Sequence, residues 1–305
     1  MLCILYVTTI GFLLGLVGLL VERMLPPAAP RRWLWCAIIP VSLYLPGYYR
    51  VHHALPVAEL AAPPTHTDAL AAAWTGATDL DFWARVESWN GMINLLWHIA
   101  SAALILWGLA GAWRVWRIQR DSHTVAHVDG TEVLVTPSIG PATVGLLRAR
   151  VVVPRWVLGL PAAQRGYVVR HEDEHRRAHD ATLLFLASLT LVLAPWNLAL
   201  WWQLRRLHLA VELDCDTRVV AALGDPTAYG ETLLAIAQAA TRGRRLQPAL
   251  LGVGSLERRL VALVAPAPLR RHERWLAPAL IAAILLVVLA LPHPIIEHAA
   301  HTLAR

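Results

Sequence analysis

The residues that most constrain this fold form an apolar run at 2–21 that contains no charged side chain, LCILYVTTIGFLLGLVGLLV. About 20 apolar residues in a helix span a bilayer, and the runs at 33–49, 91–113 and 275–291 have the same character. A soluble domain has about a quarter of its residues charged, whereas only 16% are charged here and 57% are hydrophobic. We therefore expect an integral membrane protein with four spanning helices. A cleaved signal peptide usually begins with a basic segment. No such segment precedes the first run, so we expect this helix to be retained.

The basic side chains predict the orientation of these helices. All 27 are arginines, and they cluster beside the apolar runs rather than in one basic patch, which argues against a nucleic-acid partner. The clusters lie at 22–32, 114–120 and 270–274, whereas 51–90 is mostly acidic. Cytoplasmic loops carry the excess of Lys and Arg. We therefore expect an external N-terminus, an external loop at 51–90, a cytoplasmic segment at 114–274 and an external tail.

These boundaries divide the chain into three parts. We expect a transmembrane region at 1–113, a cytoplasmic domain at 114–270, and a fourth spanning helix with a short tail at 271–305. Within the external loop, 54–78 is rich in Ala, Pro and Thr and predicts a loosely ordered segment, and 81–89 predicts a short interfacial helix.

The cytoplasmic domain begins with two β-branched stretches. Residues 131–137 (TEVLVTP) and 148–154 (RARVVVP) predict strands, and the segment between them predicts turns. From about Pro161 onward the pattern predicts helices. Breaks are expected at Pro195, Gly224–Pro226 and Gly243–Pro248.

The motif with most chemical content is HEDEH at 171–175. On a helix, His171 and His175 share one face a turn apart. The H-E-x-x-H spacing lets two imidazoles bind one Zn²⁺ while Glu172 reaches its water as general base. The competing interpretation is an ordinary charged helix end.

A catalytic zinc ion requires a third protein ligand, for which the sequence offers three candidates. His179 lies a further turn along, where a straight helix cannot bring three side chains to one ion. His208 and Glu212 lie on a later helix. Glu212 is favoured because it gives a His₂Glu set, and Asp216 on the same face is placed to accept a hydrogen bond from a ligand histidine.

Together these residues resemble a known family. H-E-x-x-H followed by Asp180, PWN at 195–197, RRL at 205–207 and E-x-x-C-D from Glu212 to Asp216 look like the BlaR/MecR-type membrane antirepressor metallopeptidases. The resemblance covers about residues 1–292 and includes the strand-bearing segment upstream of the motif.

The resemblance implies a site and a fold. His171, His175 and Glu212 would bind Zn²⁺, Glu172 would be the general base, Asp216 would support a ligand, and Asp180 would support the fold around the ligands. A mostly α membrane protein is implied, with a cytoplasmic α+β gluzincin-like zinc protease domain. The apolar segment 181–202 must return to the cytoplasmic side for Glu212, so we expect a re-entrant or membrane-lying helical hairpin.

Three features depart from the family pattern. Asp173 and Glu174 are acidic where relatives commonly have small or apolar residues, and they are expected to add negative charge near the metal. Members that sense β-lactams carry a penicillin-binding domain after the fourth helix, whereas only a short tail follows residue 292 here. The chain also contains no lysine, so it has no S-x-x-K serine motif, and we do not expect a β-lactam acylation sensor.

The function expected from this reading is a regulatory zinc endopeptidase in the cytoplasmic (inner) membrane, with its active site facing the cytoplasm. Its partners would be the lipid bilayer and a cytoplasmic protein substrate, for example a winged-helix repressor. Two alternatives remain open: a membrane receptor or scaffold with a vestigial metal site, and a housekeeping membrane peptidase.

The sequence also offers candidates for an oxyanion donor and for a strand that binds substrate. Tyr229 and His208 are possible oxyanion donors, and the stretch around 144–153 is a possible sheet edge for binding substrate as an added strand. The three cysteines suggest no disulfide framework or cysteine-based zinc site, and Cys215 stands alone.

Overall fold

A computed structural model describes most of the chain. The described residues are 2–26, 29–52, 66–121, 125–128, 130–136, 140–243, 253–264 and 273–291. Part of the expected external loop, the expected break around 244–248, the basic pair at 270–271 and the expected tail after 292 lie outside them.

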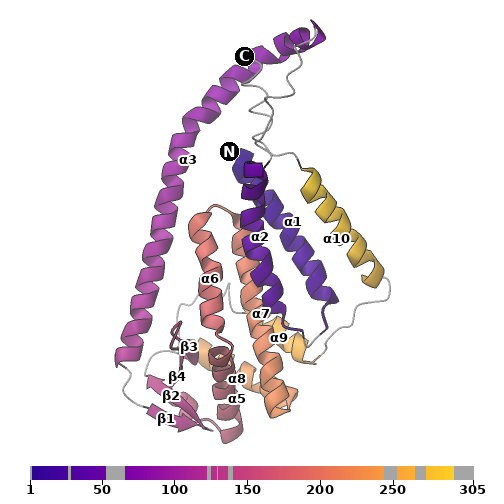
Figure 1. Cartoon of the computed structure of the whole chain (residues 1–305). Coiled ribbons are helices and arrows are strands. Elements are labelled where there is room, and N and C mark those ends of the chain that lie inside the picture. The colour runs from indigo at the N-terminus through magenta and orange to yellow at the C-terminus, as the bar shows by residue number, and fades with distance from the viewer. Residues whose placement is uncertain are drawn as a thin grey trace.

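The described part of the chain is mostly helical and contains one small sheet (Figure 1). Its helices are α1 (Leu2–Met24), α2 (Arg31–His52), α3 (His66–Asp121), α4 (Arg155–Leu158), α5 (Ala162–Arg177), α6 (Asp180–Leu193), α7 (Leu198–Leu223), α8 (Pro226–Gly243), α9 (Val253–Val264) and α10 (Glu273–Ala290). Its strands are β1 (Val125–Val128), β2 (Thr131–Thr136), β3 (Ala142–Val144) and β4 (Arg150–Pro154).

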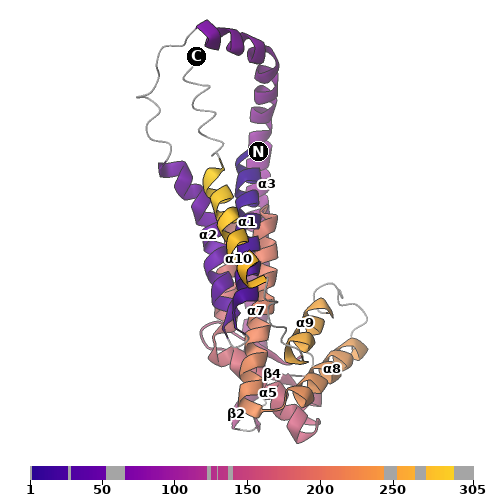
Figure 2. The ribbon, with the colours of Figure 1, turned by 90° about the vertical axis from the view of Figure 1, so that its right-hand side faces the viewer.

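The helices α1, α2, α6, α7 and α10 form a bundle, and α3 runs along one side of it against α6 (Figure 1). Trp35 and Ile39 of α2 pack with Leu191 of α6 and with Leu200 and Leu207 of α7 in one buried cluster. A second cluster joins α1 to α10. The sheet and the shorter helices lie at one end of this bundle, as both views show (Figures 1 and 2).

Two of the described helices are long and apolar enough to cross a membrane, Ile4–Met24 and Gly91–Arg120. In the most apolar stretch of Gly91–Arg120 no residue is buried, and side chains such as Trp107 (76% exposed) present an apolar surface. Exposing such a surface to water is unfavourable. The other two expected spans, 33–49 and 275–291, are not both long and apolar enough by the same measure. Residues 276–290 of α10 form a shorter apolar helix, and α2 contains Pro40 and Pro46.

Residues 181–202 form a helical hairpin, as expected, from α6 and the start of α7, which are joined by a turn at 194–197. The placement of this hairpin in the membrane stays a prediction. Asn197 caps α7, since its side-chain oxygen accepts hydrogen bonds from the amides of Ala199 and Leu200. Ser101 Oγ donates to the carbonyl of Val192 at 2.7 Å and joins α3 to the end of α6. The hairpin therefore packs among the long helices and brings α7 back toward the sheet.

The sheet supports the motif helix. Its strand order is β1-β2-β4-β3, with β2 and β4 parallel and both outer pairs antiparallel. Valines on one face, including Val133, Val151 and Val153, pack against Val168 and Val169 of α5. The opposite face packs against Val115 near the end of α3. The sheet thus fixes α5 relative to the long helices.

Three local expectations need correction. The turn region between the predicted strands contains β3, and β1 was not predicted, because strands this short carry little alternation. Residues 66–121 form one helix, so 66–78 is not a loose segment and 81–89 is not a separate helix. The helical run after Pro161 also breaks at His179, which adopts a left-handed backbone (φ 55°).

Candidate metal centre

The two motif histidines face each other on α5. Their Nε2 atoms lie 3.2 Å apart, and their rings meet edge to face with centroids 4.7 Å apart. Both side chains are 12% exposed. The spacing of one helical turn therefore produces the arrangement that the sequence predicted for His171 and His175.

Glu212 of α7 completes a set of three donor residues. Its Oε2 lies 3.5 Å from Nε2 of His171, and its Oε1 lies 3.6 Å from Nε2 of His175. Ligand atoms about 2.0–2.1 Å from a tetrahedral zinc ion lie about 3.4 Å from one another. The side chains of His171, His175 and Glu212 thus fit a single ion of that size.

The other two candidates for a third ligand lie away from this set. His179 is exposed, and its left-handed backbone ends the turn after α5. His208 is also exposed, and its Nδ1 contacts the carbonyl of Leu204 on its own helix at 2.8 Å. The structure therefore brings Glu212 to the histidine pair, and neither His179 nor His208.

Cys215 provides an alternative sulfur donor that the sequence reading did not anticipate. Donor atoms of His171, His175 and Cys215 lie within 4.8 Å of one another. Its Sγ lies 3.3 Å from Nδ1 and 3.3 Å from the carbonyl oxygen of His171. Because Nδ1 points away from the face shared with Glu212, the oxygen donor matches the paired Nε2 atoms better than the sulfur does. The expectation that Cys215 stands alone was wrong.

The outer nitrogen of His175 contacts a buried carboxylate. Its Nδ1 lies 2.8 Å from Oδ2 of Asp180, which is 2% exposed. With Nε2 turned toward the donor set, Nδ1 carries the hydrogen and donates it to Asp180. The left-handed backbone of His179 makes this contact possible, because it ends α5 and turns Asp180 back toward the preceding helical turn.

The outer nitrogen of His171 contacts a tyrosine. Nδ1 lies 2.9 Å from Oη of Tyr229, which donates to Oδ1 of Asp216 at 2.6 Å. Asp216 itself lies 3.7 Å from His171 Nδ1, so it acts on His171 through Tyr229 and not directly as expected. Tyr229 is 1% exposed and lines the cavity beside Glu172, and its role as an oxyanion donor stays a prediction.

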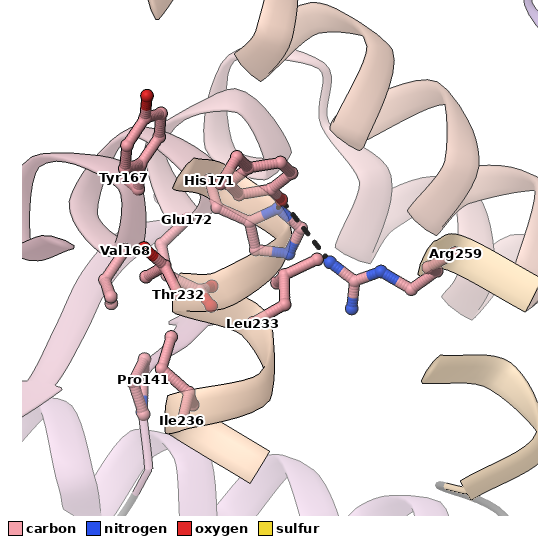
Figure 3. A pocket seen from close by; sticks show the side chains of 10 residues that line it. Pro141, Tyr167, Val168, His171, Glu172, Thr232, Leu233, Ile236 and Arg259 are labelled. Carbon is pink, nitrogen blue, oxygen red and sulfur yellow. Dashed lines mark hydrogen bonds between the residues drawn. The ribbon is translucent and has the colours of Figure 1, made fainter. Parts of the chain in front are cut away.

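Glu172 lies beside the histidines and is 9% exposed. The hydroxyl of Thr143 on β3 donates to its backbone carbonyl at 2.5 Å and lies 3.3 Å from its carboxylate. A cavity of about 140 Å³ opens next to Glu172 and His171. In Figure 3, Pro141 and Ile236 line the end of this cavity away from Arg259.

The charges in the site favour a cation. Burial lowers the pKa of His171, but Cys215 and Glu212 outweigh it and raise that pKa to about 10. Burial likewise lowers the pKa of His175, and its hydrogen bond to Asp180 raises it to about 11. Burial raises the pKa of Glu212, but the hydrogen bond from His171 holds it well below its usual range. A divalent metal satisfies the same negative surroundings by displacing protons from the imidazoles.

One comparison with known proteins found a family for the chain. A family model described as BlaR1 peptidase M56 matches residues 2–263. The chain belongs to the BlaR1 peptidase M56 family. The resemblance seen in the sequence is thereby confirmed, and membership assigns the chain to a family of membrane-associated metallopeptidases. No curated protein and no solved structure matches it significantly.

In this M56 family member, the two unusual acidic residues of the motif are neutralised by arginines. Asp173 contacts the side chains of Arg176 and Arg177, each at 2.7 Å. Glu174 pairs with Arg170 at 2.6 Å and with Arg218 of α7 at 3.1 Å. Asp173 and Glu174 therefore bring negative charge to α5 as expected, and arginines of α5 and α7 compensate it.

Arg259 could not be predicted as a site residue from the sequence, whereas Cys215 could have been. Arg259 of α9 pairs with Glu212 at 2.9 Å and with Asp216 at 2.7 Å, although it lies far from both in the chain. Cys215 was detectable, because it follows Glu212 by three residues and shares its helix face. The stretch around 144–153 was expected to form a sheet edge for substrate. Its second half belongs to β4, which lies between β2 and β3, whereas the outer strands of the sheet are β1 and β3.

Proposed function

We propose that this chain is a multi-pass membrane zinc endopeptidase with a gluzincin-like catalytic domain. The observation that carries the proposal is the convergence of three donor side chains beside a buried glutamate. His171, His175 and Glu212 come from two helices and fit one ion, and Glu172 borders the adjoining cavity.

The proposed ligands are His171, His175 and Glu212. Zinc in such a site supplies a Lewis acid for a peptide carbonyl and for water. Asp180 holds the Nδ1 hydrogen of His175, and Asp216 acts on His171 through Tyr229. These outer contacts fix the two rings with Nε2 toward the ion.

Glu172 is the proposed general base. It accepts a proton from the attacking water and later delivers it to the amine that leaves. Thr143 holds Glu172 through the backbone and the carboxylate. The apolar end of the cavity, lined by Pro141, Val168 and Ile236, would receive a side chain of the substrate.

The proposed topology has four spans with the active site on the cytoplasmic side. The Arg-rich ends of α1 and α3 lie at the same end of the bundle as the sheet and α5 (Figure 1), as the positive-inside rule requires for a cytoplasmic domain. The α6–α7 hairpin packs against α2 and α3, which supports a re-entrant segment that places the site close to the membrane surface.

The proposed substrate is a cytoplasmic protein, and the proposed role is regulatory, through cleavage of a repressor of the winged-helix type. Membership of the BlaR1 peptidase family supports this role. A housekeeping peptidase would instead cut many unrelated proteins, and a scaffold with a vestigial site would bind no zinc.

Glu172→Gln tests the proposal. We expect the purified full-length variant to retain zinc while cleavage falls by about 10²–10⁴-fold. Glu231→Gln is the matched control, since Glu231 is exposed on α8. Protein fragments are compared in cells that produce the wild type, Glu172→Gln or Glu231→Gln. Retained cleavage by Glu172→Gln would refute the mechanism. Wild-type protein that contains no zinc would favour a scaffold with a vestigial site. If many protein fragments rather than a few disappear with Glu172→Gln, a housekeeping peptidase would be favoured.

A further inference from the structure

The segment between α1 and α2 contacts the candidate metal centre at two points. This segment, called here the α1–α2 turn, comprises the described residues 25–26 and 29–32. It follows the first candidate membrane span and is more than a hundred residues from the motif in sequence. Its contacts reach Asp180, which follows the motif helix, and Asp214, which lies between Glu212 and Asp216.

The first contact ends on Asp180, the carboxylate that binds the proposed ligand His175. Arg32 Nη1 donates to Oδ1 of Asp180 at 2.6 Å. The other oxygen of the same carboxylate accepts from His175 Nδ1 at 2.8 Å and from Arg218 at 3.2 Å. The Arg32 side chain is 13% exposed and that of Asp180 is 2% exposed. Charged hydrogen bonds in such surroundings are little weakened by solvent, so Arg32 fixes the carboxylate that orients His175.

The second contact fixes Arg32 itself. The backbone amides of Arg31 and Arg32 donate to Oδ1 and Oδ2 of Asp214, each at 3.0 Å. These amides begin α2, so Asp214 satisfies donors that the helix leaves free. Residues two apart on a helix point to nearly opposite sides. One face of α7 therefore presents Glu212 to the histidines while the other binds the start of α2.

A third contact holds the end of α1 to α7. Arg206 donates to Glu22 at 2.7 Å, and Trp35 of α2 donates to the same Glu22 oxygen at 3.0 Å. The helices on both sides of the α1–α2 turn are thus attached to α7, the helix that carries Glu212. The position of Arg32 relative to Asp180 is determined by contacts independent of the Arg32 side chain.

We propose that Arg32 is a positioning residue of the metal centre, acting on His175 through Asp180. The inference rests on the proposed function, because it takes His175 as a metal ligand. It makes the α1–α2 turn a structural part of the site. Removing the Arg32 side chain leaves Oδ1 of Asp180 without its charged partner, so that the carboxylate can turn and the His175 ring loses its fixed orientation.

The test measures metal binding by the full-length protein in detergent. Zn²⁺ affinity is determined by competition with a chelator, and the visible spectrum of bound Co²⁺ reports ligand geometry. We expect Arg32→Ala to bind Zn²⁺ about 10–100-fold more weakly than the wild type and to change the Co²⁺ spectrum. Arg23→Ala is the matched control, because Arg23 is exposed at the end of α1 beside the same turn, and it should behave as the wild type.

Two further variants separate positioning from general destabilisation. Asp180→Asn should also weaken Zn²⁺ binding, and combining it with Arg32→Ala should cost less than the sum of the two, since both act on one path. Thermal unfolding is recorded for each variant. If Arg32→Ala does not fold, Arg32→Lys carries the comparison, with a smaller expected loss of affinity because a donor and the charge remain.

The possible outcomes are distinct. Wild-type affinity and an unchanged Co²⁺ spectrum in folded Arg32→Ala, or in Arg32→Lys where that variant carries the test, would overturn the inference and leave the proposed function intact. Fully additive losses in the double variant would also overturn it. Wild-type protein that binds no Zn²⁺ would overturn the inference and the proposed function together.

Discussion

Arg259 forms an ion pair with Glu212, with Nη1 2.9 Å from Oε2, although α9 and α7 are separated by α8 in the chain. The same guanidinium donates from Nε and Nη2 to Asp216 at 2.8 and 2.7 Å. One arginine therefore holds a proposed ligand and the carboxylate that acts on His171 through Tyr229.

Removing Arg259 should weaken the metal centre. Arg259→Met leaves two carboxylates without their cation, and breaking such a buried pair costs about 3–5 kcal/mol. We expect a lower unfolding temperature and Zn²⁺ binding about 10–100-fold weaker. Arg258→Met, at an exposed neighbouring position on α9, is the control. Equal Zn²⁺ affinity in the two variants would show that Arg259 does not hold Glu212 in place.

The third ligand can be identified by comparing Glu212→Ala with Cys215→Ala. The paired distances from Glu212 to both Nε2 atoms favour the carboxylate. We therefore expect Glu212→Ala to lose bound Zn²⁺ and Cys215→Ala to keep it, as measured by metal analysis after desalting. The reverse pattern would assign the ligand to sulfur, whose Co²⁺ complexes also absorb strongly in the near ultraviolet.

Tyr229→Phe tests the contact between Tyr229 and His171. The change removes a buried hydroxyl that donates to Asp216 and receives the Nδ1 hydrogen of His171. Leaving these groups unpaired costs about 1–3 kcal/mol, and Zn²⁺ affinity should fall about tenfold or more. Tyr167→Phe is the control, since that hydroxyl contacts the Asp225 carbonyl at 3.4 Å. Tyr229→Phe with normal affinity would mean that Asp216 supports His171 without the tyrosine.

Gly15→Ala tests the packing of α1 on α7. A Cβ atom at Gly15 would lie 2.1 Å from Cζ3 of Trp202, so the helices would have to separate. Overpacking of this kind costs about 1–3 kcal/mol, and thermal unfolding in detergent should shift to lower temperature. Gly108→Ala on α3 is the control, because nothing lies within 4 Å of the added Cβ. Similar melting of both variants would contradict this helix contact.

The candidate donors could be predicted from sequence because they follow local rules. The four-residue spacing of His171 and His175 decides that they share a helix face. Glu212 was selected by chemistry among three candidates, and the structure places it with the histidines. The apolar runs likewise predicted the long helices, since hydrophobicity and length are properties of a segment.

The remaining parts of the site depend on contacts between distant segments. The sequence determined that α5 presents two histidines and a glutamate, because helical periodicity places them. Only the tertiary structure decided that the left-handed turn at His179 returns Asp180 to His175. It also decided that Arg32 and Arg259 hold the carboxylates around the site. An arginine far away in sequence acquires a partner only when packing brings the two charges together and excludes water from them.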